Sequence, residues 1–141
     1  MRRLGTLGVV VIPYLLLVGI GLIVSAIPGS VILIKLDPTI RFWAAAAILG
    51  APYWFGVNIL ERLLAKWSPA PKQWWRTLMF SWVAVLVVLG TVNLVGAYVL
   101  GDLAWVNLKL FGLTGAFWLT GLVLIFMHFQ RSAPNAARER A

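Results

Sequence analysis

The chain has no cysteine and a single histidine, and only 11% of its 141 residues are charged. The absence of cysteine excludes disulfide bonds, thiolate catalysis and cysteine-ligated metal sites. The lone His128 excludes a bis-histidine haem or a multi-histidine metal site within one chain. The sequence also lacks a nucleophile elbow around any serine and a glycine-rich phosphate loop. It therefore predicts neither an enzyme nor a bound cofactor.

Hydrophobic residues make up 62% of the chain and occur in long runs rather than in alternation. A water-soluble domain of this size needs more polar surface, whereas long apolar runs are typical of membrane-spanning helices. The net charge of +8 comes from basic residues beside these runs, which favours contact with anionic lipid headgroups over nucleic acid. We expect an all-α integral membrane protein that binds no nucleic acid.

Four apolar segments predict four transmembrane helices in one antiparallel bundle within residues 1–130. The run from residue 4 to residue 34 would be roughly 46 Å long as one helix, well beyond the hydrocarbon core, so Pro28 is expected to end the first helix. Residues 28–39 are then expected to form an interfacial turn, Pro38 to start the second helix, and Pro52 to kink it. The predicted spans are residues 4–27, 40–64, 77–100 and 103–129, followed by a polar cytoplasmic tail at 131–141.

The basic residues divide unequally between the two ends of this predicted bundle. Nine lie on the side of the termini: Arg2, Arg3, Arg62, Lys66, Lys72, Arg76, Arg131, Arg138 and Arg140. Three lie on the opposite side: Lys35, Arg41 and Lys109. Because lysine and arginine accumulate on the cytoplasmic side of a membrane, this bias predicts that both termini are cytoplasmic.

The eight tryptophans are expected to serve structure rather than chemistry. Those near the ends of the spans are expected to form aromatic belts at the two membrane interfaces. These are Trp43, Trp67, Trp74, Trp75 and Trp105. The others lie deeper in the spans and are expected to pack between helices: Trp54, Trp82 and Trp118.

A few polar residues in or beside the spans are candidates for interaction or lipid binding, because polar groups inside a membrane are costly. Asn93 lies deep in the third span, where a hydrogen bond to a neighbouring helix is favoured over a ligand-binding role. Glu61 and Arg62 lie at the cytoplasmic end of the second span. An ion pair of Glu61 with Lys66 or Arg76, which would fix the helix end, is the favoured interpretation.

Asp102, Asn107 and Lys109 form a third polar group at the start of the last span. Asp102 and Lys109 share a face if the helix begins at the aspartate, whereas Asn107 and Lys109 point in different directions. Two interpretations stay open. Lys109 either extends outward to the interface while Asn107 closes the hairpin turn, or it turns inward to bind a lipid phosphate or a partner's carboxylate. His128 is expected to support the cytoplasmic end of the last helix.

The segment Trp105-Val106-Asn107-Leu108-Lys109-Leu110-Phe111-Gly112 closely resembles the Trp-Val-Asn-Phe-Lys-Val-Phe-Gly signature of the bacterial intracellular septation protein A family. The segment Ile34-Lys35-Leu36-Asp37-Pro38-Thr39-Ile40 resembles that family's Ile-Lys-x-x-Pro-Thr segment. Further likeness is carried by Phe55-Gly56, Arg62-Leu63-Leu64, Trp75-Arg76, Trp82, Asn93 and Gln130. The resemblance covers residues 34–130. Family members usually have more spans before the Ile-Lys-x-x-Pro-Thr segment, so the chain resembles a shortened relative.

The resemblance implies a non-enzymatic inner-membrane protein linked to septation, cell division and the cell envelope. It implies a scaffold that acts through protein–protein interaction. The alternatives are a small transporter or lipid-handling subunit, and an accessory subunit of a larger bioenergetic complex. The expected partners are anionic lipid headgroups at the basic cytoplasmic loop and other inner-membrane proteins, in a larger complex or a homo-oligomer.

Overall fold

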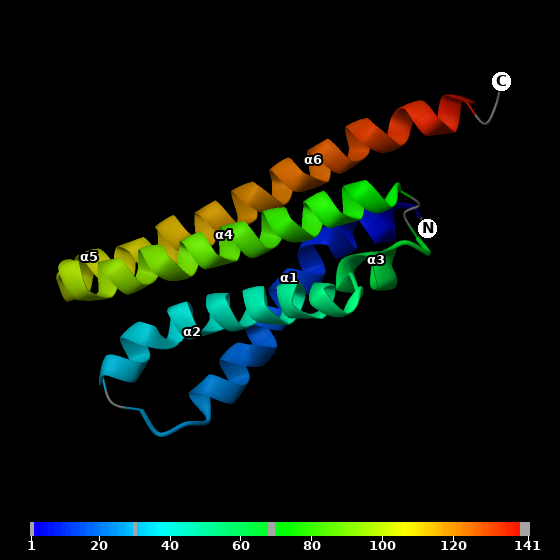
Figure 1. Cartoon of the computed structure of the whole chain (residues 1–141). Coiled ribbons are helices and arrows are strands. Elements are labelled where there is room, and N and C mark those ends of the chain that lie inside the picture. Colours follow the sequence, from blue (N-terminus) through cyan, green and yellow to red (C-terminus); the bar gives the residue numbers. More distant parts are fainter. Residues whose placement is uncertain (1, 30, 68–69, 139–141) are drawn as a thin grey trace.

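The computed structural model describes residues 2–29, 31–67 and 70–138, and the regular elements in these residues are all helical (Figure 1). The all-α prediction is confirmed for this part of the chain. Three stretches are long and apolar enough to cross a membrane: Leu7–Ser25, Lys72–Val99 and Asp102–His128. The elements are α1 (Arg2–Ser25), α2 (Val31–Gly50), the 3₁₀ helix η1 (Ala51–Phe55), α3 (Ile59–Leu64), α4 (Lys72–Val99), α5 (Asp102–Asn107), the π-helical η2 (Leu108–Leu113) and α6 (Thr114–Arg138).

The long helices run alongside one another. Helix α4 lies beside α6, and α2 packs against both α4 and α1 (Figure 1). Helix α1 begins and α6 ends at the end of the bundle that also holds α3, whereas α5 lies at the opposite end. The turn between α4 and α5 consists of Leu100 and Gly101 alone, which agrees with the short gap between the predicted spans 77–100 and 103–129.

The predicted interfacial turn over residues 28–39 is wrong from Val31 onward, because α2 begins there and contains Pro38 in its interior. A proline inside a helix removes one backbone hydrogen bond and strains the preceding turn. Tertiary packing offsets that cost. Pro38 and Thr39 are buried, and the Thr39 hydroxyl donates a 3.1 Å hydrogen bond to the carbonyl of Gly90 in α4.

The predicted helix over residues 40–64 is interrupted rather than kinked. Helix α2 ends at Gly50, η1 carries Pro52, and Gly56 adopts a left-handed conformation with φ of 75° before α3 begins. The physical reason is that Pro52 lacks the N–H needed to continue the α-helical ladder, and a glycine accepts positive φ without strain. Asn58 then starts α3, where its side-chain oxygen accepts a 3.2 Å hydrogen bond from the backbone N–H of Glu61.

Several tryptophans depart from the predicted arrangement, although Trp43 and Trp67 are exposed as belt residues would be. Helix α4 begins at Lys72, five residues before the predicted start, so Trp74 and Trp75 lie inside a helix and are buried, as is Trp105. Trp54, expected between helices, is instead 88% exposed on η1. Trp82 is fully buried and contacts the Phe117 ring at 5.1 Å, as predicted. The Trp82–Phe117 contact is thus part of the apolar packing between α4 and α6.

The polar residues that follow the last predicted span continue the helix. Helix α6 extends to Arg138, so residues 131–138 of the predicted polar tail are helical, and residues 139–141 lie outside the described residues. The helix continues because this segment contains alanine and arginine, which favour helix, although Pro134 lies within it.

Candidate functional site

A buried amide connects three helices at the end of the bundle near α5. Asn93 of α4 is fully buried, and its Nδ2 donates to the carbonyl of Lys35 at 3.0 Å and to the Thr39 hydroxyl at 2.9 Å. Its Oδ1 accepts a 3.2 Å hydrogen bond from the indole N–H of Trp105 in α5. The favoured interpretation of Asn93 as an interhelical bond thus matches its geometry. We call Lys35, Thr39, Asn93 and Trp105 the Asn93 junction.

Close approach of α2 and α4 makes the Asn93 junction possible. A Cβ at Gly90 would meet the Trp43 indole and the Cβ of Phe42, so a glycine is required for this separation of the two helices. The Trp43 indole also donates to the carbonyl of Val87 at 3.3 Å. Small residues allow helices in membranes to pack closely and to hydrogen-bond across the interface.

Charged residues surround the Asn93 junction in two ion pairs. The Lys35 ammonium lies 2.6 Å from the Asp102 carboxylate, which connects α2 to the start of α5. Within α2, Arg41 forms two contacts with Asp37, at 2.6 and 2.8 Å. Asp102 therefore pairs with a lysine of another helix, and not with Lys109 of its own.

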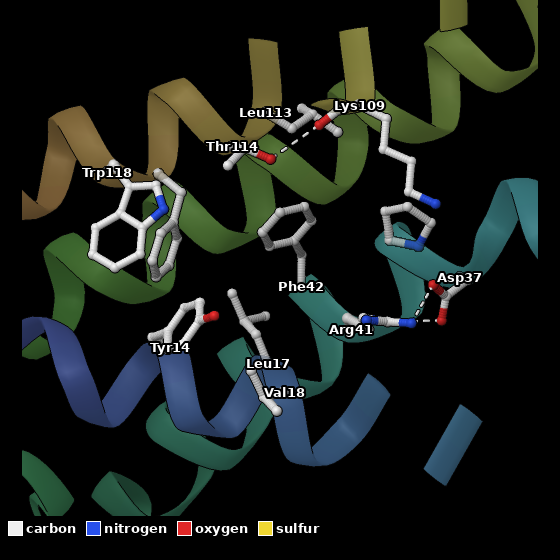
Figure 2. Close-up of a pocket in the computed structure, with 12 residues that line it drawn as sticks. Tyr14, Leu17, Val18, Asp37, Arg41, Phe42, Lys109, Leu113, Thr114 and Trp118 are labelled. Atoms are coloured by element: carbon white, nitrogen blue, oxygen red, sulfur yellow. Dashed lines mark hydrogen bonds and ion pairs between the residues drawn. The ribbon is translucent and has the colours of Figure 1, made fainter. Parts of the chain in front are cut away.

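Lys109 lies in the π-helical segment η2, with its ammonium 5.2 Å from the ring centroid of Trp105. A π-helical turn leaves the regular hydrogen-bond ladder, and the Thr114 hydroxyl donates to the carbonyl of Lys109 at 3.1 Å. The side chain is half-buried and turns toward α2 (Figure 2). Asn107 is exposed and lies within α5, not in the hairpin turn, so the expectation that it closes the turn is wrong.

A cavity of about 270 Å³ lies between α1, α2 and the η2–α6 helix. Its two ends differ in polarity. Lys109 and the Arg41–Asp37 ion pair lie at one end, and the rings of Tyr14 and Trp118 lie at the other (Figure 2). Apolar side chains line the space between them, including Leu17, Val18, Phe42 and Leu113.

The opposite end of the bundle holds a second buried polar contact. The Nδ1 atom of His128 accepts a 2.6 Å hydrogen bond from the indole N–H of Trp74, and the two rings stack with centroids 5.8 Å apart. His128 is buried, and Trp75 also packs against it at 5.9 Å. His128 therefore joins α6 to the start of α4, a contact that sequence spacing does not reveal.

Glu61 and Arg62 lie on α3 at this same end. The predicted ion pair of Glu61 with Lys66 or Arg76 does not occur among the residues that the structure describes. The helix end is fixed instead at the start of α3, where the Asn58 side chain accepts from the backbone N–H of Glu61, and Arg62 is exposed. In the same described residues, no three histidine or acidic side chains come together as a metal site would require.

Helices long enough to cross a membrane, with polar groups bonded between them, define a helical multi-pass membrane protein. The model of the intracellular septation protein A family matches residues 7–134, and the chain belongs to that family. It is 38% identical over 84 residues to the inner membrane-spanning protein YciB of Burkholderia orbicola strain MC0-3. The Burkholderia mallei strain NCTC 10229 protein of that name is 37% identical over 84 residues, and that of Burkholderia vietnamiensis strain G4 is 38% identical.

Each of these alignments covers 59% of the chain and 48% of the relative, so the chain spans about half the length of the curated relatives it matches. No solved structure matches the chain. The family and its relatives place the protein in the bacterial inner membrane, with septation as the family's associated process.

Sequence reasoning named Asn93, Asp102 and Lys109 but missed most of their partners. Thr39 and Trp105 complete the hydrogen bonds of Asn93, yet Thr39 was assigned to a turn and Trp105 to a membrane belt. The available signal was the Ile-Lys-x-x-Pro-Thr segment itself, because its threonine hydroxyl and the backbone carbonyl of its lysine both accept hydrogen bonds from Asn93.

Proposed function

We propose that the chain is a non-enzymatic scaffold of the inner membrane that acts in septation and in the cell envelope by binding other membrane proteins. The observation that carries this proposal is the use of the buried polar groups. Asn93, Thr39 and Trp105 bond to one another and to backbone carbonyls, so they hold α2, α4 and α5 together. Side chains that are hydrogen-bonded between helices stabilise the arrangement of those helices, and these contacts favour a structural role over a role in catalysis.

The outer faces of this platform offer surfaces for partner helices. On α4, Val88, Val95 and Val99 are 58%, 56% and 74% exposed, and Leu119 and Leu122 give α6 a similar apolar face. Association of helices in lipid depends on close packing rather than on a hydrophobic driving force. A flat row of β-branched side chains, stiff at χ1, suits such packing.

Photo-crosslinking in growing cells tests the scaffold function. A photoreactive residue is placed at Val88 or Val95 on α4, at Leu119 on α6, and at buried Leu86 as the control. We expect one exposed face to crosslink a defined inner-membrane protein, and Leu86 to crosslink none. Crosslinks to lipid alone from every exposed position would refute a scaffold.

The proposal includes four membrane crossings and cytoplasmic termini. In it, α2 crosses the membrane in addition to the three long apolar stretches described above. Support comes from its 20 residues, about 30 Å of helix, and from the Arg41–Asp37 ion pair, which lowers the cost of burying charge. The unequal placement of basic residues gives the same orientation.

Because the chain has no cysteine, a maleimide reacts only with a cysteine introduced by substitution, and its labelling reports the topology. Gly29→Cys lies between α1 and α2, and Gln73→Cys lies at the start of α4. We expect a membrane-impermeant maleimide to label position 29 in intact spheroplasts and position 73 only after permeabilisation. Labelling of both positions from the same side would mean that α2 does not cross the membrane.

A further inference from the structure

The charges at the α5 end of the bundle do not balance. Five charged side chains lie there, and four of them form the ion pairs Lys35–Asp102 and Arg41–Asp37. Lys109 is the fifth, and no carboxylate lies within ion-pair distance of it among the described residues. A half-buried cation without an anion is costly near hydrocarbon, so this position favours an anionic group from outside the chain.

The cavity beside Lys109 determines what kind of anion fits. Its polar end holds Lys109 and the Arg41–Asp37 ion pair, whereas its far end is bordered by Tyr14 and Trp118, whose ring centroids are 5.3 Å apart (Figure 2). The residues between are apolar. A ligand that fills this space therefore needs an anionic head and an apolar chain.

A second cavity of about 360 Å³ continues from the same charged residues toward the other end of α1. It also contacts Asp37, Arg41 and Lys109, and it reaches Ser25 and Gly29 beside the connection between α1 and α2. Together the two cavities fall within the range of roughly 300–1,000 Å³ that is usual for ligand sites. The second cavity gives a head group at Lys109 a path to the surface of the membrane.

Lys109 lies close to the start of the last long helical stretch. It lies seven residues after the start of α5 at Asp102, or about 10 Å along the helix, and its stem can extend toward the interface. The π-helical turn at this point is a feature that often marks functional sites, and here the Thr114 hydroxyl bonds the displaced carbonyl.

We propose that the protein binds one anionic phospholipid, with the phosphate at Lys109 and an acyl chain in the cavity between α1, α2 and α6. Other ligands fit less well. A partner's carboxylate or inorganic phosphate would neutralise the charge of Lys109 but would leave the apolar part of the cavity unfilled. A zwitterionic lipid fills the cavity but brings a positive head group next to Lys109 and Arg41. This binding site depends on the membrane location of the chain and not on its scaffold function.

Native mass spectrometry of the purified chain tests the proposal. The chain is offered equal amounts of phosphatidylglycerol and phosphatidylethanolamine in one detergent, and the retained lipid is identified. We expect wild-type protein to prefer phosphatidylglycerol by about tenfold, the effect of one charge-assisted hydrogen bond. Lys109→Met should abolish this preference, and Lys109→Arg should keep it. Lys66→Met removes an exposed cation of the basic cytoplasmic loop; it is the control for headgroup attraction at that loop and should leave the preference set by Lys109 in place.

Two further arms separate the lipid from other anions. Leu17→Trp fills the cavity and should lower retained phosphatidylglycerol severalfold, while excess glycerol phosphate, which lacks acyl chains, should displace none. If Lys109→Met does not fold, as judged by its melting temperature, Leu17→Trp decides the question. Any one of four results would overturn the proposal. The wild type could retain both lipids equally, or Lys109→Met could keep the preference. Leu17→Trp could retain as much phosphatidylglycerol as the wild type, or glycerol phosphate could displace the lipid.

Discussion

Replacing Asn93 by leucine should destabilise the bundle by separating α2 and α5 from α4. Both side chains have four non-hydrogen atoms and branch at Cγ, so the change leaves no cavity and its main effect is the loss of hydrogen bonds. It removes bonds to the Lys35 carbonyl, the Thr39 hydroxyl and the Trp105 indole, all between 2.9 and 3.2 Å. The Trp105 N–H is left buried without its acceptor, because that residue is only 5% exposed.

The expected loss follows from the strength of such bonds in membrane proteins. Hydrogen bonds between transmembrane helices average about 0.6 kcal/mol each and reach about 1.7 kcal/mol. Three bonds therefore give a decrease of about 2 kcal/mol in the free energy of unfolding, with about 5 kcal/mol as the upper limit. A double-mutant cycle of Asn93→Leu with Trp105→Phe should show a coupling of about 0.6 kcal/mol for the bond that these side chains share.

Equilibrium unfolding in mixed micelles, with increasing fractions of denaturing detergent, measures these differences. Thr91→Val is the matched control, since Thr91 lies on the same helix but donates only to the carbonyl of Val87 within α4. We expect the control to change the free energy of unfolding by less than about 0.5 kcal/mol. If Asn93→Leu is no more destabilising than Thr91→Val, the Asn93 junction does not hold the helices together.

Three other substitutions probe separate contacts in the same assay. His128→Phe removes the acceptor of the Trp74 indole and should cost about 1–3 kcal/mol, and a loss below 0.5 kcal/mol would contradict a structural role of that bond. Gly90→Leu should cost about 1–3 kcal/mol by forcing α2 away from α4, and an unchanged stability would mean that the helices are not in close contact. Asp102→Asn should cost less than about 1 kcal/mol, because its ion pair with Lys35 is largely exposed, and a larger loss would show that the pair is shielded from water.

Helix positions were predictable where apolar length alone determines them. The first and third spans and the short turn before α5 lie close to their predicted positions. The predictions for the two prolines of the second span are wrong. Pro38 is predicted to start the helix but lies inside α2, and Pro52 is predicted to kink the helix but follows its end. Local rules treat both prolines alike, and only the contacts of Thr39 with α4 and the left-handed Gly56 distinguish them.

The candidate site was predictable as residues but not as an arrangement. Asn93 and Lys109 stand out because polar groups are rare inside membrane spans. Two of the partners of Asn93 come from positions 54 and 58 residues earlier in the chain and the third from 12 residues later, and no periodicity connects them. The π-helical turn at Leu108–Leu113 also escaped prediction, because the apolar pattern of that segment fits an ordinary α-helix.

The sequence by itself determined that this is a helical membrane protein of the septation family without thiol chemistry, because composition, run length and a short signature need no spatial information. The tertiary structure alone decided which polar groups meet. Asn93 is bonded to α2 and α5, His128 to Trp74, and Lys109 lies at the polar end of a cavity whose remaining walls are largely apolar. The reason is that helix packing sets these contacts, and packing depends on side chains far apart in the chain.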